Sequence, residues 1–120
     1  MVANRGRYDL EERTLVFARR IRTFLKKLPR SLLTTDDVHQ LLRSSGSVGA
    51  NYIEANNSLS RKDFRMRVKI CRKEAKESSY WMRLIEISDK SLEIEKAALL
   101  DESIQLTKIF GAILRNTKAE

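Results

Sequence analysis

The sequence predicts an all-α fold, an antiparallel up-down-up-down four-helix bundle formed by a single domain of residues 1–120. Apolar residues recur at three- and four-residue steps in four long segments, at residues 9–28, 36–58, 61–88 and 93–116. The links between these segments are a few residues long, which favours antiparallel neighbours. With one proline, four glycines and 7% aromatic residues, the composition argues against loop-dominated and all-β folds.

The first predicted helix covers residues 9–28. Asp9 followed by Glu12 resembles a capping box, with Asp in the Ser/Thr position. One stripe repeats along the segment at helical spacing, formed by Leu10, Thr14, Phe17, Ile21, Phe24 and Leu28. Pro29 follows directly, and a proline clashes with the preceding turn and donates no backbone hydrogen bond. We therefore expect the helix to end before Pro29.

The second predicted helix, residues 36–58, contains Gly46 and Gly49, and its start can be capped by Thr34 or Thr35. A glycine costs roughly 1 kcal/mol relative to alanine inside a helix, so a helix broken by a glycine loop is one interpretation. A continuous helix packed closely on a neighbour is the other, and the apolar period favours it because it continues in phase past both glycines. In that case Gly49→Ala should be mild or stabilising if there is room for a methyl group.

The third and fourth predicted helices are residues 61–88 and 93–116. Ser60 with Asp63 forms a capping-box pattern at the start of the third helix. Residues 89–91 are expected to link the two helices. Acidic residues near the start of the fourth helix and basic residues near its end have the favourable signs for the helix dipole.

The net charge of +8 is distributed unevenly along the chain. Residues 1–30 and residues 60–83 each carry a net charge of +6, whereas residues 31–59 and residues 84–120 each carry −2. The basic excess therefore belongs to the first and third predicted helices.

Seven cations share one stripe of the third predicted helix, within an arc of about 100° when each residue advances by about 100°. They are Lys62, Arg65, Lys69, Arg72, Lys73, Lys76 and Arg83. A row of cations along a rod suits a polyanion, whose binding gains affinity from displaced counterions. We therefore identify these residues as candidate nucleic-acid contacts, and the lack of interleaved aromatic residues argues against base stacking. The alternative is a solvated face with a few ion pairs to other helices.

A second apolar strip on the same helix is separate from its core stripe. It consists of Met66, Ile70, Trp81 and Leu84. A helix of a monomeric bundle needs one apolar face, so a second one predicts burial against another subunit. The strip also defines an alternative function, a protein–protein interaction scaffold with no nucleic-acid role, in which the cations serve solubility.

The sequence carries no evident catalytic or metal-binding motif. HExxH, the phosphate-binding GKS/T loop and the GxSxG elbow are all absent. His39, the only histidine, is expected to face solvent near the start of the second helix. Cys71, the only cysteine, lies on the core stripe, which indicates a small buried hydrophobe. We therefore expect no enzymatic activity, no metal and no cofactor.

The expected location is the cytoplasm. One cysteine permits no intrachain disulfide, and this suits a reducing compartment. The first residues lack the apolar region of a secretory signal. No stretch approaches the 18 or so apolar residues of a membrane-spanning helix.

Several motifs resemble a known family over roughly residues 8–114. They are Ser47–Asn51 (SVGAN) with Tyr52, Glu54 and Ala55, then Ser60 with Asp63 and Phe64, and Lys73–Leu84 (KEAKESSYWMRL). They resemble the bacterial four-helix-bundle proteins named for open reading frames in intervening sequences of 23S ribosomal RNA genes. More distantly, the sequence is similar to the accessory variability proteins of diversity-generating retroelements.

The resemblance implies a closed up-down bundle, assembly into a ring-like homopentamer and no known enzymatic activity. The retroelement relatives are basic and bind nucleic acid and a reverse transcriptase, which implies RNA or DNA as a partner. The family has no established catalytic motif, so the resemblance implies no catalytic residue.

Overall fold

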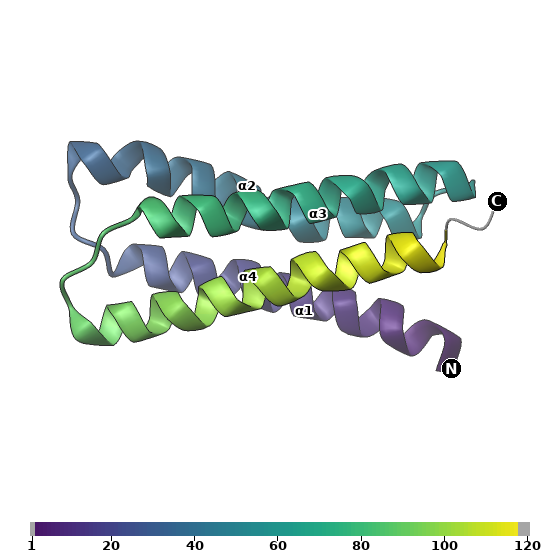
Figure 1. The fold of residues 1–120 in the computed structure, drawn as a ribbon, viewed down its shortest axis with the longest axis horizontal. Helices are drawn as coiled ribbons and strands as arrows, with labels where there is room; N and C mark the ends of the chain where they lie inside the picture. The colour runs from purple at the N-terminus through teal and green to yellow at the C-terminus, as the bar shows by residue number, and fades with distance from the viewer. Residues whose placement is uncertain (1, 118–120) are drawn as a thin grey trace.

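The computed structural model describes residues 2–117 and, from residue 9 onward, their side chains. Four helices make up the fold: α1 (Val2–Lys26), α2 (Leu32–Asn56), α3 (Arg61–Leu84) and α4 (Lys90–Asn116). Each runs antiparallel to the next, α1 also packs on α4, and the bundle is an elongated rod of 48 × 25 × 20 Å (Figure 1). The predicted up-down-up-down four-helix bundle is thus confirmed.

The core lies along the axis of the rod, where each helix contributes one stripe at helical spacing. The largest fully buried side chains include Phe17, Ile21 and Phe24 of α1, Leu41 and Val48 of α2, Val68 and Met82 of α3, and Leu99, Leu106 and Phe110 of α4. The α1 stripe expected from the sequence is buried except for Leu28, which packs against the core from its edge. None of the helices within residues 2–117 combines the length and apolar character needed to cross a membrane.

The ends of α1 differ from those expected. The helix begins at Val2, so Asp9 lies inside it and the predicted capping box is wrong. The residues before Asp9 continue the helix, so Asp9 has no free helix terminus to cap. At the other end α1 stops at Lys26, and the backbone N–H groups of Lys27 and Leu28 bond to carbonyls three residues back, which tightens the last turn before Pro29.

The start of α2 also corrects the sequence analysis, because Ser31 caps the helix and Thr34 and Thr35 lie in its first turn. The Ser31 hydroxyl accepts a hydrogen bond from the Thr34 backbone N–H at 3.2 Å. Both threonine hydroxyls donate to the Ser31 carbonyl. Ser31 is the first capping-competent residue after Pro29, and starting there adds a turn of helical hydrogen bonds.

The link between α3 and α4 is shifted from its predicted position. The predicted Ser60 cap of α3 is confirmed. The helix ends at Leu84, before the predicted end at residue 88, because Ile85 adopts an extended backbone and is buried in the core. Asp89 caps α4 by accepting a hydrogen bond from the Leu92 N–H at 3.0 Å, so α4 begins at Lys90. A hydrogen bond from the Ser91 hydroxyl and, after it, the one from the Leu92 N–H lower the pKa of the Asp89 carboxyl group.

The continuous-helix interpretation of α2 is confirmed, since neither Gly46 nor Gly49 has a positive φ. The two glycines nevertheless differ in their surroundings. A Cβ on Gly49 would lie 2.8 Å from the Thr14 Oγ1 and 3.2 Å from the Thr14 Cβ of α1, so there is no room for a methyl group. A Cβ on Gly46 would meet only the Arg22 guanidinium, at 3.7 Å. The close approach of α1 and α2 therefore depends on Gly49.

Candidate nucleic-acid interface

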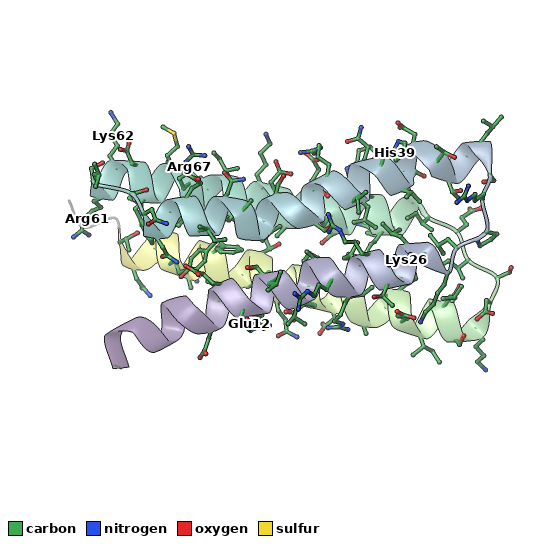
Figure 2. The ribbon with its side chains drawn as sticks, turned by 180° about the vertical axis from the view of Figure 1, so that it is seen from behind. Glu12, Lys26, His39, Arg61, Lys62 and Arg67 are labelled. Carbon is green, nitrogen blue, oxygen red and sulfur yellow. The ribbon has the colours of Figure 1, made fainter. Side chains whose placement is uncertain are left out.

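The outer surface of α3 carries six of the seven cations singled out in the sequence. The exposed six are Lys62, Lys69, Arg72, Lys73, Lys76 and Arg83. Figure 2 shows Lys62, at the start of α3, pointing away from the bundle. The stripe expected from the helical spacing therefore forms a row of exposed positive charge along this helix.

These α3 cations lack carboxylate partners. Across the seams between helices, Arg13 pairs with Glu102 at 2.7 Å and Lys27 pairs with Glu95 at 3.2 Å. Among the side chains that the structure describes, none of the seven stripe residues forms an ion pair within 4.0 Å. The ion pairs that a merely solvated face was expected to make are therefore missing from this stripe.

The two carboxylates in the middle of α3 face another helix. Glu74 is buried and lies 3.4 Å from Arg43 of α2, which also pairs with Glu77. Both acidic side chains are thus directed towards the α2–α3 seam and bound there. They do not reduce the positive charge of the outer stripe.

Arg65 lies in a different environment from the other stripe residues. It is half-buried, and its guanidinium donates to the Leu114 carbonyl at 2.5 Å and to the Thr117 hydroxyl at 2.9 Å. A cation bonded to the free carbonyls of a helix C-terminus also interacts favourably with the helix dipole. Arg65 therefore holds the end of α4 against α3.

Arg72 leans towards the same seam but stays exposed. A Cβ added to Gly111 of α4 would lie 3.9 Å from the Arg72 Nε, so the guanidinium rests on the space left by that glycine. Lys69, Lys73 and Lys76 make no hydrogen bond or ion pair within the described part of the chain. The exposed Lys62 and Arg83 likewise make none there, so these five cations are the charges most available to an external anion.

The predicted apolar strip is only partly open to solvent. The exposed fractions are 53% for Met66 and 44% for Leu84. Ile70 is half-buried, and Trp81 packs against the core with its ring edge-on to Tyr80. The Trp81 indole N–H is buried with no hydrogen-bond partner among the described residues. The two exposed members lie near opposite ends of α3.

The single cysteine and the single histidine lie in different surroundings. Cys71 is fully buried, and desolvation raises the pKa of its thiol to about 12, so it stays protonated at neutral pH. His39 is exposed on the second turn of α2. Within residues 9–117, no group of three or more His, Cys, Asp or Glu side chains is arranged to hold a metal ion.

Fold and surface together define a basic four-helix bundle whose third helix presents unpaired cations. The family described as 23S rRNA-intervening sequence protein matches residues 8–112. The chain belongs to this family, which confirms the main resemblance found in the sequence. The distant similarity to accessory variability proteins stays a prediction.

A solved structure supports the assignment. A protein of unknown function from the S23 ribosomal protein family of Bacteroides thetaiotaomicron has 30% sequence identity and a TM-score of 0.72. The alignment covers 87% of this chain and 96% of that one. Among curated proteins, none matches the chain significantly.

Proposed function

We propose that the protein is a non-enzymatic homo-oligomer that binds RNA or DNA through phosphate contacts from α3. One observation carries the proposal: the exposed cations of α3 have no carboxylate partners, whereas Arg13, Lys27 and Arg43 at the helix seams do. A cytoplasmic location is part of the proposal, since Cys71 is buried and needs no oxidising compartment.

The arrangement of the cations lowers the stability of α3 itself. Lys69 and Lys73 are four residues apart, as are Arg72 and Lys76, and each like-charged pair at this spacing costs about 0.2–0.5 kcal/mol. A row of such pairs is unfavourable for the free protein. It becomes favourable when a polyanion lies along the helix and releases its condensed counterions.

Binding of this kind depends little on sequence. Contacts to phosphate position a protein on nucleic acid without distinguishing its bases. The exposed lysines on α3 act as point charges and have no fixed fork geometry. We therefore expect similar affinities for unrelated sequences of equal length.

Oligomerisation would multiply these weak contacts. In a ring of subunits the α3 stripe recurs, and linked sites bind with an avidity that exceeds the affinity of each one. The exposed side chains of Met66 and Leu84 support a subunit contact on α3, and the family resemblance implies a pentamer. A light-scattering mass of 13.9 kDa at every concentration would contradict this part of the proposal.

The test is a charge reversal confined to the free cations of α3. The variant changes Lys69, Arg72, Lys73 and Lys76 to Glu and leaves Arg65 intact, because Arg65 bonds to α4. A matched control makes the same change in net charge at four exposed cations elsewhere, Arg19, Arg20, Lys90 and Lys108.

Fluorescence anisotropy with labelled single- and double-stranded oligonucleotides gives the readout. Four lost phosphate contacts should weaken binding by roughly 100-fold or more, with helix content and oligomer mass unchanged. The control should weaken binding far less. Equal losses in the two variants, or no binding by the native protein at low salt, would contradict the proposal.

The scaffold function remains a second candidate because Met66 and Leu84 are exposed. The double variant Met66→Glu/Leu84→Glu discriminates between the two functions. If it lowers the oligomer mass, these side chains contact other copies of the chain. If native protein binds no nucleic acid and this variant leaves the mass unchanged, the scaffold function is favoured.

A further inference from the structure

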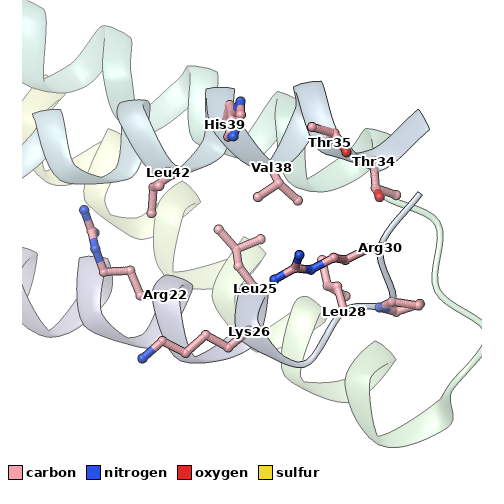
Figure 3. A pocket seen from close by; sticks show the side chains of 11 residues that line it. Arg22, Leu25, Lys26, Leu28, Arg30, Thr34, Thr35, Val38, His39 and Leu42 are labelled. Atoms are coloured by element: carbon pink, nitrogen blue, oxygen red, sulfur yellow. The ribbon is translucent and has the colours of Figure 1, made fainter. Parts of the chain in front are cut away.

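A groove runs between the C-terminal half of α1 and the greater part of α2. One hollow of about 500 Å³ lies between the end of α1, the loop and the start of α2 (Figure 3). A second hollow of about 440 Å³ continues along α2 as far as Ala50. The two share Arg22, His39 and Leu42 among their lining residues, so they form one continuous groove.

The floor of the groove is apolar. Leu25 of α1 and Val38 of α2 point towards one another across it in Figure 3, and Leu28 and Leu42 extend it. Farther along, Gly46 and Ala50 of α2 carry no large side chain, and the flexible Arg22 guanidinium lies 3.7 Å from the place of a Gly46 Cβ. The groove is therefore open to a partner with an apolar face.

The α1 side and the loop bring three cations to this floor. Arg22, Lys26 and Arg30 all line the first hollow, and neither hollow is lined by an Asp or Glu. None of the three cations forms an ion pair with a carboxylate in the part of the chain whose side chains are described. The neighbouring Lys27, by contrast, is bound to Glu95 of α4. Among the described side chains, the groove thus has three positive charges without a carboxylate partner, one of which, Arg22, donates a hydrogen bond to the Ala18 carbonyl at 3.4 Å.

The length and chemistry of the groove select among anionic ligands. From Thr34 to Ala50 it follows about 24 Å of helix, which is more than four turns. A small anion would leave most of that length unused. A nucleic-acid backbone would make no use of an apolar floor, and no Phe, Tyr or Trp lines the groove for base stacking.

A helix with one apolar stripe flanked by carboxylates fits the apolar floor, the cations and the length of the groove. Amphipathic helices bind apolar grooves through side chains at three- and four-residue spacing. Arg22 and Lys26 lie one turn apart on α1, so carboxylates one turn apart on a partner helix can face both. We propose that the α1–α2 groove is a docking site for an acidic amphipathic helix of a partner protein. This interaction is independent of the proposed nucleic-acid binding by α3.

The test uses the native full-length protein and a designed probe. The probe is a fluorescein-labelled peptide of about 18 residues, long enough to follow about 27 Å of helix, with leucine every third or fourth position and glutamate on both flanks. Two control peptides replace glutamate by lysine or scramble the order of the residues. Anisotropy should show saturable binding of the acidic amphipathic peptide and at least about tenfold weaker binding of both controls.

Two variants locate the binding site. Arg22→Glu/Lys26→Glu/Arg30→Glu should weaken peptide binding by roughly tenfold or more, whereas Arg19→Glu/Arg20→Glu/Lys90→Glu should change it less than about twofold. Gly46→Leu should also weaken binding, because the new side chain fills the groove. It should still fold, since a Cβ at Gly46 meets only the flexible Arg22 guanidinium.

The outcomes separate this proposal from the nucleic-acid one. Reversing Lys69, Arg72, Lys73 and Lys76 should leave peptide binding intact even where nucleic-acid binding is lost. The docking proposal is overturned if the acidic peptide binds no better than the scrambled one. It is also overturned if the Arg22/Lys26/Arg30 variant loses nucleic-acid affinity in place of peptide affinity, or changes the oligomer mass, since the groove would then be part of another interface.

Discussion

Cations at the helix seams and cations on the outer face of α3 lie in different electrostatic environments. At the seams, Arg13 binds Glu102 across α1 and α4, and Arg43 binds Glu74 across α2 and α3. On the outer face, Lys69 and Lys73 have no carboxylate partner among the described side chains. The difference shows that part of the positive charge holds the bundle together, while the excess lies where the fold does not require it.

The seams should tolerate substitution far less than the outer face, and the largest effect is expected at Gly49. Gly49→Leu should destabilise by about 3 kcal/mol through overpacking against Thr14. Gly49→Ala should still cost about 1 kcal/mol, because Thr14 is β-branched and its hydroxyl is bonded to the Leu10 carbonyl, so it moves aside with difficulty. Urea denaturation gives both values.

Gly46 supplies the control for this prediction. The space beside it is open, so Gly46→Ala should gain up to about 1 kcal/mol from helix propensity. If alanine were equally stabilising at both glycines, the close approach of α1 and α2 at Gly49 would be contradicted.

The next largest effect should follow from removing a seam cation. Arg43→Ala leaves the buried carboxylate of Glu74 without its cation and should cost about 2 kcal/mol, a value that allows for the half-exposed arginine. Lys73→Ala on the outer face should change stability by less than about 0.5 kcal/mol. Equal losses in the two variants would remove the distinction between the two kinds of cation.

Arg65 should behave as a seam residue despite its place in the basic stripe. Arg65→Ala should cost about 1 kcal/mol because the last carbonyls of α4 lose a donor. Its effect on nucleic-acid affinity should be smaller than that of Lys69→Ala. A larger effect on affinity, with unchanged thermal stability, would place Arg65 among the free cations.

The smallest expected effect is an increase in stability. Lys69 has cations three or four residues away on both sides, so Lys69→Gln should stabilise α3 by a few tenths of a kcal/mol. Arg13→Gln, which removes the pair with Glu102, should instead destabilise the bundle. Differential scanning calorimetry of the two variants should therefore show shifts of opposite sign in Tm.

Periodicity was sufficient to predict the fold, because the same three- and four-residue spacing that identifies each helix also identifies its buried face. Helix ends were harder to predict, since several residues can cap a helix and the structure uses the one that extends it most. Ser31 therefore caps α2 although Thr34 and Thr35 are also residue types that cap helices. Likewise, α1 begins at Val2 and continues through Asp9.

The sequence was sufficient to predict which face of α3 carries the cations, but not which of their side chains bond to a neighbouring helix. A helical wheel places Arg65 beside Lys69, yet cannot show that its side chain extends to the Leu114 carbonyl. The α1–α2 groove was not predictable at all, because it depends on how two helices approach one another. Gly46 and Gly49 are the same residue type on one helix, and only the position of α1 makes one open and the other closed.

The salt dependence of nucleic-acid binding tests the central claim most directly. If four cations of α3 neutralise four phosphates of a duplex, log K should fall with log salt at a slope of roughly −3.6. Lys69→Gln/Lys73→Gln removes two of those contacts and should reduce the slope to roughly −1.8. A native slope near zero, or a slope that the double variant leaves unchanged, would contradict the claim that the unpaired cations of α3 bind nucleic acid.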